Sequence, residues 1–166
     1  MKQSLMLTLC AVSLAGCLNS PAGAEPCSAP DPALLQSTWQ AFRGATLAGQ
    51  PEQAARYYKF PLQLLPPMDG TKPLKITRTV FIKNYVELFQ RGPADSEVTL
   101  LTAMKKSTGK EHIPQTKFDT AKCSFIGSTR IEDYNFVYDK KAGWQVESLY
   151  YGSNDFDIAK SAGLDR

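Results

Sequence analysis

Residues 122–152 read KCSFIGSTRIEDYNFVYDKKAGWQVESLYYG, and they give the clearest indication of secondary structure in the chain. It is dense in β-branched and aromatic residues, which are typical of strands. Polar connections divide it, and the clearest, Asp139 to Gly143, has the composition of a hairpin turn. We therefore expect a meander of three strands: Lys122–Ser128, Arg130–Asp139 and Trp144–Gly152.

The middle strand has two alternating faces, and they leave two interpretations open. One face carries Asp133 and Asn135, and if it lined a pocket, burial would raise the pKa of Asp133. The other face carries Tyr134, Phe136 and Tyr138. Three aromatic rings bury more apolar surface, which favours this second face for the core.

A segment whose apolar residues have helical spacing precedes the predicted strands. Asp31-Pro32 has the form of an N-cap followed by a proline in the first turn. Helical spacing then predicts one buried face: Leu35, Trp39, Phe42 and Thr46. Gly49 is expected to end this helix.

Shorter elements are expected between these two regions. They are a short helix from Pro51 through Tyr58, an edge strand at Leu62–Leu65 beside Pro61, a strand at Leu74–Ile76, a helix from Thr77 to about Gln90, a short helix from Asp95 or Ser96 to about Met104, and an exposed loop at Lys105–Gln115. Helices first and strands last predict an α+β domain with its helices on one face of an antiparallel sheet.

The N-terminal segment has the features of an export signal. Lys2 precedes an uncharged apolar run from Leu5 to Ala15, which is too short to cross a bilayer comfortably. Two cleavage sites fit: Leu14-Ala15-Gly16-Cys17, which resembles the bacterial lipobox, and Ala22-Gly23-Ala24.

We favour the lipobox. Residues 1–16 are then the signal peptide, Cys17 carries lipid, 17–30 form a tether, and 31–166 form a single domain. Leu18 stands where a retention signal would have Asp, and this resembles enterobacterial lipoproteins of the outer membrane, facing the periplasm. The alternative site would remove 1–24 and release a soluble periplasmic protein.

Four cysteines reduce to two once Cys10 and Cys17 are assigned to the signal region. In an oxidising periplasm, Cys27 and Cys123 most simply form a disulfide, which would stabilise the fold by roughly 4 kcal/mol. A free pair is the alternative. A metal site is disfavoured because the chain has one His and lacks C-x-x-C and H-x-x-H spacing.

Composition limits the function classes. A chain of 166 residues, 43% hydrophobic and 21% charged, fits one globular domain and excludes a disordered chain or a large multidomain enzyme. A net charge of +3 is too small to indicate a nucleic-acid binder. The sequence has no phosphate loop or dinucleotide fingerprint, and we expect no cofactor.

Beyond the leading aromatic helix, several motifs form one pattern: Tyr57-Tyr58-Lys59-Phe60-Pro61-Leu62, Ile76-Thr77, Phe81-Ile82-Lys83-Asn84-Tyr85, Leu88-Phe89 and Gly143-Trp144-Gln145-Val146. The pattern resembles small exported bacterial proteins of the nuclear-transport-factor-two-like superfamily, over about residues 31–152. The resemblance implies an α+β cone, a curved antiparallel sheet wrapped around a long helix with a pocket at its open end. That fold hosts ketosteroid isomerase, scytalone dehydratase and many binding proteins, so it does not settle function.

The sequence places no catalytic base. His112 is the one histidine, and its polar loop predicts an exposed side chain. No G-x-S-x-G motif is present. The candidate binding residues are Asp133, Asn135, Tyr85 and Tyr57.

These observations favour a non-enzymatic, lipid-anchored binding protein of the bacterial envelope, with a protein or small molecule as its partner. Two alternatives stay open. One is a periplasmic immunity or inhibitor protein, and the other is a small isomerase- or hydrolase-like enzyme that uses Asp133 with tyrosine donors.

Overall fold

The computed structural model describes residues 27–65, 72–89 and 100–150. The predicted signal peptide, both cleavage sites, Cys17 and most of the tether lie outside the described residues, as does the expected cap at Asp95 or Ser96. Within the described ranges, no helix is both long enough and apolar enough to cross a membrane.

Helix α1 (Pro32–Leu47) confirms the first helical prediction. The Asp31 carboxylate accepts a hydrogen bond from the Ala33 N–H at 2.8 Å, as an N-cap should. The helix ends before Gly49, which has a φ of 66°. Its buried face is the predicted one: Leu35, Trp39, Phe42 and Thr46.

Strand β1 (Tyr58–Leu65) corrects the prediction of an edge strand at Leu62–Leu65. A short helix α2 (Pro51–Ala54) and a 3-10 turn (Ala55–Tyr57) lead into it. The strand is longer than expected and lies inside the sheet, with a neighbour on each side. The pairing of β1 with β7 is irregular between Tyr58 and Gln63, and Pro61 lies in this interval. Proline is tolerated at such an irregularity because it has no N–H group to donate.

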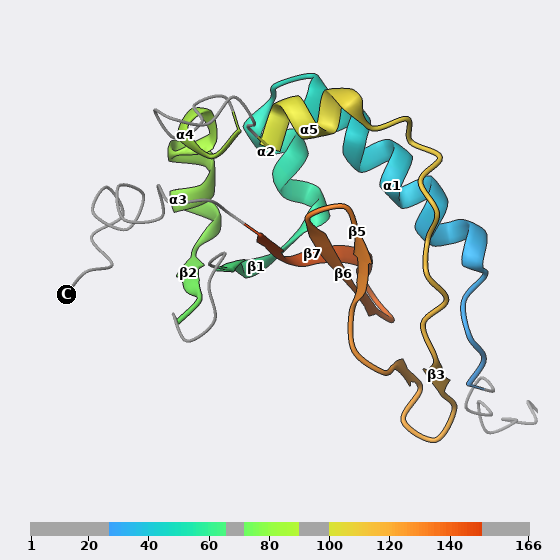
Figure 1. Ribbon diagram of the computed structural model, residues 1–166. Helices are drawn as coiled ribbons and strands as arrows, with labels where there is room; N and C mark the ends of the chain where they lie inside the picture. Colours follow the sequence, from blue (N-terminus) through green and yellow to red (C-terminus); the bar gives the residue numbers. More distant parts are fainter. Residues whose placement is uncertain (1–26, 66–71, 90–99, 151–166) are drawn as a thin grey trace, which may run out of the picture.

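The main sheet is mixed, which corrects the antiparallel prediction. Its order is β2-β1-β7-β6-β5, and β1 runs parallel to β7 while the other neighbours are antiparallel. The new strands are β2 (Leu74–Ile76), β5 (Thr129–Ile131), β6 (Tyr134–Asp139) and β7 (Gly143–Tyr150). A hairpin forces antiparallel pairing, but β1 and β7 are separated by the whole middle of the chain, so no turn fixes their direction. Figure 1 shows α1, α2 and α5 on one side of this sheet.

The helix predicted from Thr77 is divided. The Thr77 hydroxyl caps α3 (Arg78–Lys83) by accepting from the Val80 N–H at 3.3 Å. Asn84 interrupts the helix with a φ of −105° and ψ of 21°, and its side chain donates to the Val80 carbonyl at 2.8 Å. Helix α4 (Tyr85–Phe89) follows, and α5 (Leu100–Lys106) extends past the predicted end at Met104.

The range Arg130–Asp139 was predicted to form one strand, but it forms a hairpin. The prediction of a single strand with two continuous alternating faces was therefore wrong. A tight turn at Glu132 and Asp133 separates β5 from β6, and Glu132 has a φ of 50°. The preceding prediction, Lys122–Ser128, is also wrong, because only β4 (Ser124–Phe125) forms there and pairs with β3 (Phe118–Asp119) in a separate small sheet.

The core is largely aromatic and centres on Phe42. The centroid of its ring lies 5.0 Å from that of Tyr134, 5.4 Å from Tyr58 and 5.8 Å from Phe136. Trp39, one turn earlier, is fully buried. Tyr134 and Phe136 therefore point into the core, as the second interpretation of the β6 sequence predicted.

Candidate functional site

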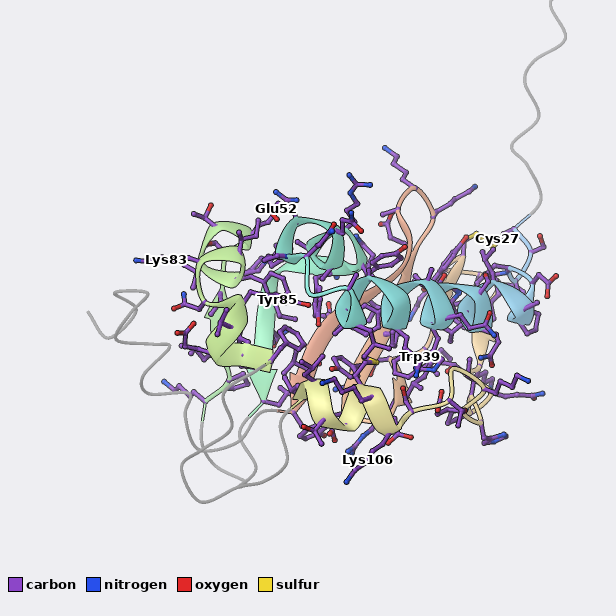
Figure 2. The ribbon with its side chains drawn as sticks, turned by 90° about the horizontal axis from the view of Figure 1, so that it is seen from above. Cys27, Trp39, Glu52, Lys83, Tyr85 and Lys106 are labelled. Carbon is purple, nitrogen blue, oxygen red and sulfur yellow. A yellow bond between two sulfur atoms is a disulfide. The ribbon has the colours of Figure 1, made fainter. Side chains whose placement is uncertain are left out.

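The Cys27–Cys123 disulfide confirms the cysteine prediction. The two Cα atoms lie 5.6 Å apart, although the residues are 96 positions apart in sequence. The bond joins residues 27–30, which we call the N-terminal wall, to the turn between β3 and β4. Figure 2 shows Cys27 just before the start of α1.

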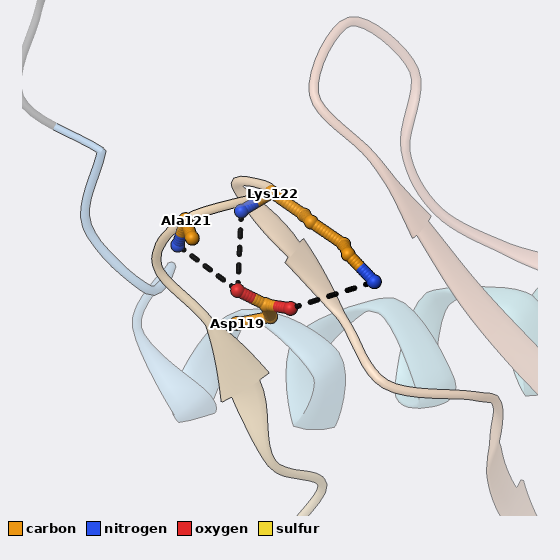
Figure 3. Close-up of polar contacts among 3 residues, drawn as sticks. All are labelled: Asp119, Ala121 and Lys122. Atoms are coloured by element: carbon orange, nitrogen blue, oxygen red, sulfur yellow. Dashed lines mark hydrogen bonds and ion pairs between the residues drawn. The ribbon is translucent and has the colours of Figure 1, made fainter.

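The β3–β4 turn is ordered by Asp119. Its Oδ1 accepts the N–H groups of Ala121 at 2.9 Å and Lys122 at 3.1 Å, and its Oδ2 lies 4.0 Å from the Lys122 ammonium (Figure 3). Cys123 then adopts a φ of 53°. This turn presents the Cys123 sulfur to the N-terminal wall.

A third segment, residues 107–116, is held against α1 by side chains of the helix. Gln36 Nε2 donates to the Gly109 carbonyl at 2.6 Å, and Arg43 Nη2 donates to the Ser107 carbonyl at 2.8 Å. The Trp39 indole N–H donates to the Glu111 carboxylate. A segment expected to be an exposed loop is thereby fixed along one side of the helix.

A cleft of about 520 Å³ opens between these parts. Its apolar surface comes from aliphatic, aromatic and proline side chains: Leu35, Ile113, Phe118, Phe125, Trp144, Pro30, Pro32 and Pro114. Polar side chains also line it: Asp31, Gln36, Glu111, His112, Gln115, Thr116 and Thr129. The cleft has the size of a site for a small ligand.

The Glu111 carboxylate is the strongest electrostatic feature of this cleft. Partial burial raises its pKa, but hydrogen bonds from the Thr108 N–H and the Trp39 indole lower it by more, to about 2. The group is therefore ionised at neutral pH. The second carboxylate, Asp31, is engaged as the cap of α1.

Two of the predicted binding residues, Tyr57 and Tyr85, lie away from this cleft. The Tyr85 hydroxyl donates to the Thr46 carbonyl at 3.3 Å, and burial raises the pKa of Tyr85 to about 12. Tyr57 packs against Phe42 with ring centroids 6.0 Å apart. Both residues therefore contact the C-terminal half of α1, Tyr85 through Thr46 and Tyr57 through Phe42. Tyr85 is labelled in Figure 2.

The other two, Asp133 and Asn135, are near one another in sequence but differ in setting. Asp133 lies in the β5–β6 turn with a side chain 44% exposed, and its Oδ1 is 3.5 Å from Arg130 Nη2. Asn135 is buried and its Nδ2 donates to Ser148 Oγ at 3.0 Å. Neither lines the cleft, so the structure does not bring the four predicted residues together.

Sequence reasoning missed the residues that shape the cleft. His112 is exposed, as expected, yet it lies at the cleft. A local signal for Glu111 exists, because Thr108 and Glu111 have the spacing of a capping box, and the Thr108 N–H does donate to Glu111. Gln36 carries no such signal, since its partner Gly109 is distant in sequence.

Two buried tyrosines form a second feature that the sequence did not reveal. The hydroxyls of Tyr58 and Tyr134 have no hydrogen-bond partner among residues 27–65, 72–89 and 100–150. Burial is the main reason that the pKa of each is raised well above its ordinary value. The electrostatic influence of Tyr134 adds to the effect on Tyr58, and that of Asp133 adds to the effect on Tyr134.

The described residues contain no group of three or more His, Cys, Asp or Glu side chains that could hold a metal ion. Chemically, the site offers an apolar surface bordered by carboxylates, an imidazole and hydroxyls. No protein-family model, curated protein sequence or solved structure matches this chain significantly.

Proposed function

We infer that the chain is an exported, non-enzymatic binding protein of the bacterial cell envelope, anchored by lipid on Cys17. Its cleft binds a small ligand with an apolar body. The single observation that carries this proposal is the cleft of about 520 Å³, whose walls are the N-terminal wall, segment 107–116 and the β3–β4 hairpin.

The apolar part of the cleft supports an apolar ligand body. Phe125 lies 4.8 Å from Trp144 and 5.0 Å from Phe118, measured between ring centroids. These rings provide a continuous aromatic surface, and burying apolar ligand area against it supplies the main binding free energy.

The charged side chains of the cleft support a neutral or cationic ligand. Asp31 and Glu111 line it, and none of its described lining residues is Lys or Arg. An anionic ligand would approach two carboxylates without a cation to compensate them.

The envelope location rests on the sequence, and the disulfide agrees with it. Disulfides persist in oxidising compartments such as the periplasm. The lipobox-like Leu14-Ala15-Gly16-Cys17 favours a lipid anchor in the outer membrane over release as a soluble protein.

We also propose that the fold belongs to the α+β cone class of the nuclear-transport-factor-two-like superfamily. The packing of α1 over the sheet supports this, since Trp39 and Phe42 contact Tyr134 and Phe136. The parallel β1–β7 pair departs from the antiparallel sheet that the resemblance implies.

The alternatives receive less support. An enzyme using Asp133 would need that carboxylate in a pocket, whereas it pairs with Arg130 at an exposed turn. No described contact favours an inhibitor of a particular hydrolase, and both alternatives stay predictions.

A fluorescent probe tests the binding function. N-phenyl-1-naphthylamine is neutral and apolar, and 1-anilinonaphthalene-8-sulfonate is its anionic analogue. With the exported chain carrying Cys17→Ser, so that no lipid binds the probe, we expect saturable binding of the neutral probe at one site and weaker binding of the anionic one. Absence of saturable binding by the neutral probe would contradict the proposal.

A matched pair of variants assigns the binding to the cleft. Ile113 lines the cleft, whereas Ile126 is 56% exposed and does not. Ile113→Asp should weaken binding of the neutral probe at least tenfold, and Ile126→Asp should leave it unchanged. Thermal melts of both variants establish that they are folded, and equal binding by both would place the probe elsewhere.

The anchor is tested by mass spectrometry of the mature N-terminus. An acylated Cys17 is expected. A mature protein that starts at an unmodified Glu25 would contradict the lipid anchor and would support the soluble periplasmic form.

A further inference from the structure

We propose that the Cys27–Cys123 disulfide controls the cleft. Reduction by a dithiol releases the N-terminal wall, weakens ligand binding, and leaves the rest of the fold intact. The ligand-binding part of this inference rests on the proposed function, whereas the release of the wall does not.

The N-terminal wall has little to hold it apart from the disulfide. Ser28, Ala29 and Pro30 make no hydrogen bond with any described residue, and Ser28 and Ala29 are exposed. Ala29 and Pro30 nevertheless line the cleft. The next fixed point along the chain is Asp31, where the cap of α1 begins.

The opposite walls are held by contacts that do not involve either cysteine. Segment 107–116 is tied to α1 by Gln36 and Trp39. The β3–β4 hairpin is tied to the main sheet by Phe125, whose ring centroid lies 4.8 Å from Trp144 and 5.8 Å from Tyr138. Loss of the disulfide therefore frees the N-terminal wall and not its neighbours.

The bond is accessible to a reductant. Cys27 and Cys123 are both only partly buried, and their neighbours Ser28 and Lys122 are exposed. Partly exposed disulfides are the ones that exchange with external thiols.

The reaction is a two-electron thiol–disulfide exchange. A thiolate of the dithiol attacks one cysteine sulfur, the S–S bond breaks, and the other cysteine leaves as a thiolate that takes up a proton. The second thiolate of the reductant then displaces the first cysteine. The products are two cysteine thiols in the protein and one disulfide in the oxidised reductant.

The β3–β4 turn keeps its shape when the bond is broken. The Asp119 carboxylate still accepts the N–H groups of Ala121 and Lys122, and Cys123 therefore stays at its φ of 53°. Reduction thus detaches the N-terminal wall from a turn that remains in place.

The experiment compares the exported Cys17→Ser chain before and after treatment with dithiothreitol and alkylation by iodoacetamide. The heteronuclear ¹⁵N NOE of the Ser28, Ala29 and Asp31 amides reports on motion of the wall, hydrogen exchange reports on the rest of the fold, and N-phenyl-1-naphthylamine reports on the cleft. We expect lower NOE values at these three amides, unchanged hydrogen exchange over residues 36–47 and 134–150, and binding at least fivefold weaker. Cys27→Ser/Cys123→Ser should reproduce the reduced state and should not respond to dithiothreitol.

Each other outcome has a distinct meaning. Unchanged NOE values at Ser28, Ala29 and Asp31, or unchanged probe affinity in a protein that binds the probe, would overturn the proposal. Faster hydrogen exchange throughout residues 36–47 and 134–150 would overturn it as well, because the bond would then hold the whole fold together. If neither form binds the probe but the NOE values at Ser28, Ala29 and Asp31 fall after reduction, the proposed function fails and the release of the wall stands.

Discussion

Cys123 and Gly143 stand at the same distance from an aspartate that orders a hairpin turn, and both adopt a positive φ. Each follows an aspartate by four residues, and each aspartate accepts the N–H groups two and three positions ahead. For Asp139 these are Lys141 and Ala142, both at 2.8 Å, and Asp119 makes the equivalent pair of bonds. Gly143 has a φ of 75° and Cys123 one of 53°. Glycine adopts this conformation without strain, whereas cysteine does not.

The comparison predicts an unusual ranking of disulfide-free variants. Cys27→Ser/Cys123→Gly should be more stable than Cys27→Ser/Cys123→Ala by about 1 kcal/mol, because only the glycine removes the strain. Both should be less stable than the oxidised protein, by roughly 4 kcal/mol at most. Urea unfolding curves measure the difference.

Gly143→Ala is the matched control for that ranking. A Cβ atom at Gly143 would meet no atom within 4 Å, so the substitution tests the backbone conformation alone. It should lower the free energy of unfolding by about 1 kcal/mol. If alanine and glycine were equally stable at position 123, the assignment of backbone strain to Cys123 would be wrong.

Replacing Glu111 should separate its hydrogen bonding from its charge. Glu111→Ala leaves the indole N–H of the fully buried Trp39 without its acceptor, which costs about 1–3 kcal/mol of stability. Glu111→Gln keeps an acceptor oxygen and should cost less at neutral pH. Equal losses for the two variants would show that the Trp39 contact contributes little.

The same residue predicts a dependence of stability on pH. Folding lowers the pKa of Glu111 from an ordinary value of 4.5 to about 2, so the stability it contributes is fully present above about pH 4.5. That contribution is lost as the pH falls towards 2. The difference in unfolding free energy between the natural protein and Glu111→Gln should therefore shrink between about pH 4.5 and 2, and a constant difference would contradict the assignment.

We expect that removing the hydroxyl group of either of two buried tyrosines does not lower the stability of the protein. The hydroxyls of Tyr58 and Tyr134 bond to no group in the described part of the chain, so Tyr58→Phe and Tyr134→Phe should be neutral or slightly stabilising. Tyr85→Phe removes the bond to the Thr46 carbonyl and should cost about 0.5–1.5 kcal/mol. Thermal unfolding of the three variants would reveal a different order if ordered water served the first two hydroxyls.

Gln36 and Gln40 on α1 provide a test of how segment 107–116 is held. Gln36→Leu loses the bond to the Gly109 carbonyl, whereas Gln40 is exposed and does not line the cleft. Faster hydrogen exchange over residues 108–112 and weaker probe binding are expected for Gln36→Leu only. The same result for Gln40→Leu would mean that the bond is not what positions the segment.

Local patterns predicted the parts of the fold that depend on local physics. The buried face of α1 follows from helical spacing and from the Asp31 cap, and both are encoded within one turn or two. Strand β2 at Leu74–Ile76 and the Thr77 cap were predicted for the same reason. The disulfide followed from counting cysteines against the expected compartment.

Features that depend on distant partners were missed. The direction of β1 relative to β7 is set by packing, and no turn encodes it. The β5–β6 turn uses Glu132 at a positive φ, where sequence signals call for glycine or asparagine. The cleft needs Gln36 from α1 and Glu111 from segment 107–116, which are distant in sequence, and each residue taken alone looks like an ordinary solvated side chain.

The Cys27–Cys123 bond also sets the path of mechanical force through the molecule. Tension applied to the chain before Cys27, as by an anchor in a membrane, passes through the sulfur atoms directly to the β3–β4 turn. If the opposing force acts on a residue after Cys123, the tension does not pass through residues 28–122, which contain α1 and the other helices. In the oxidised protein the force is therefore carried by β4 to β7. After reduction the same force would act first on the first turn of α1.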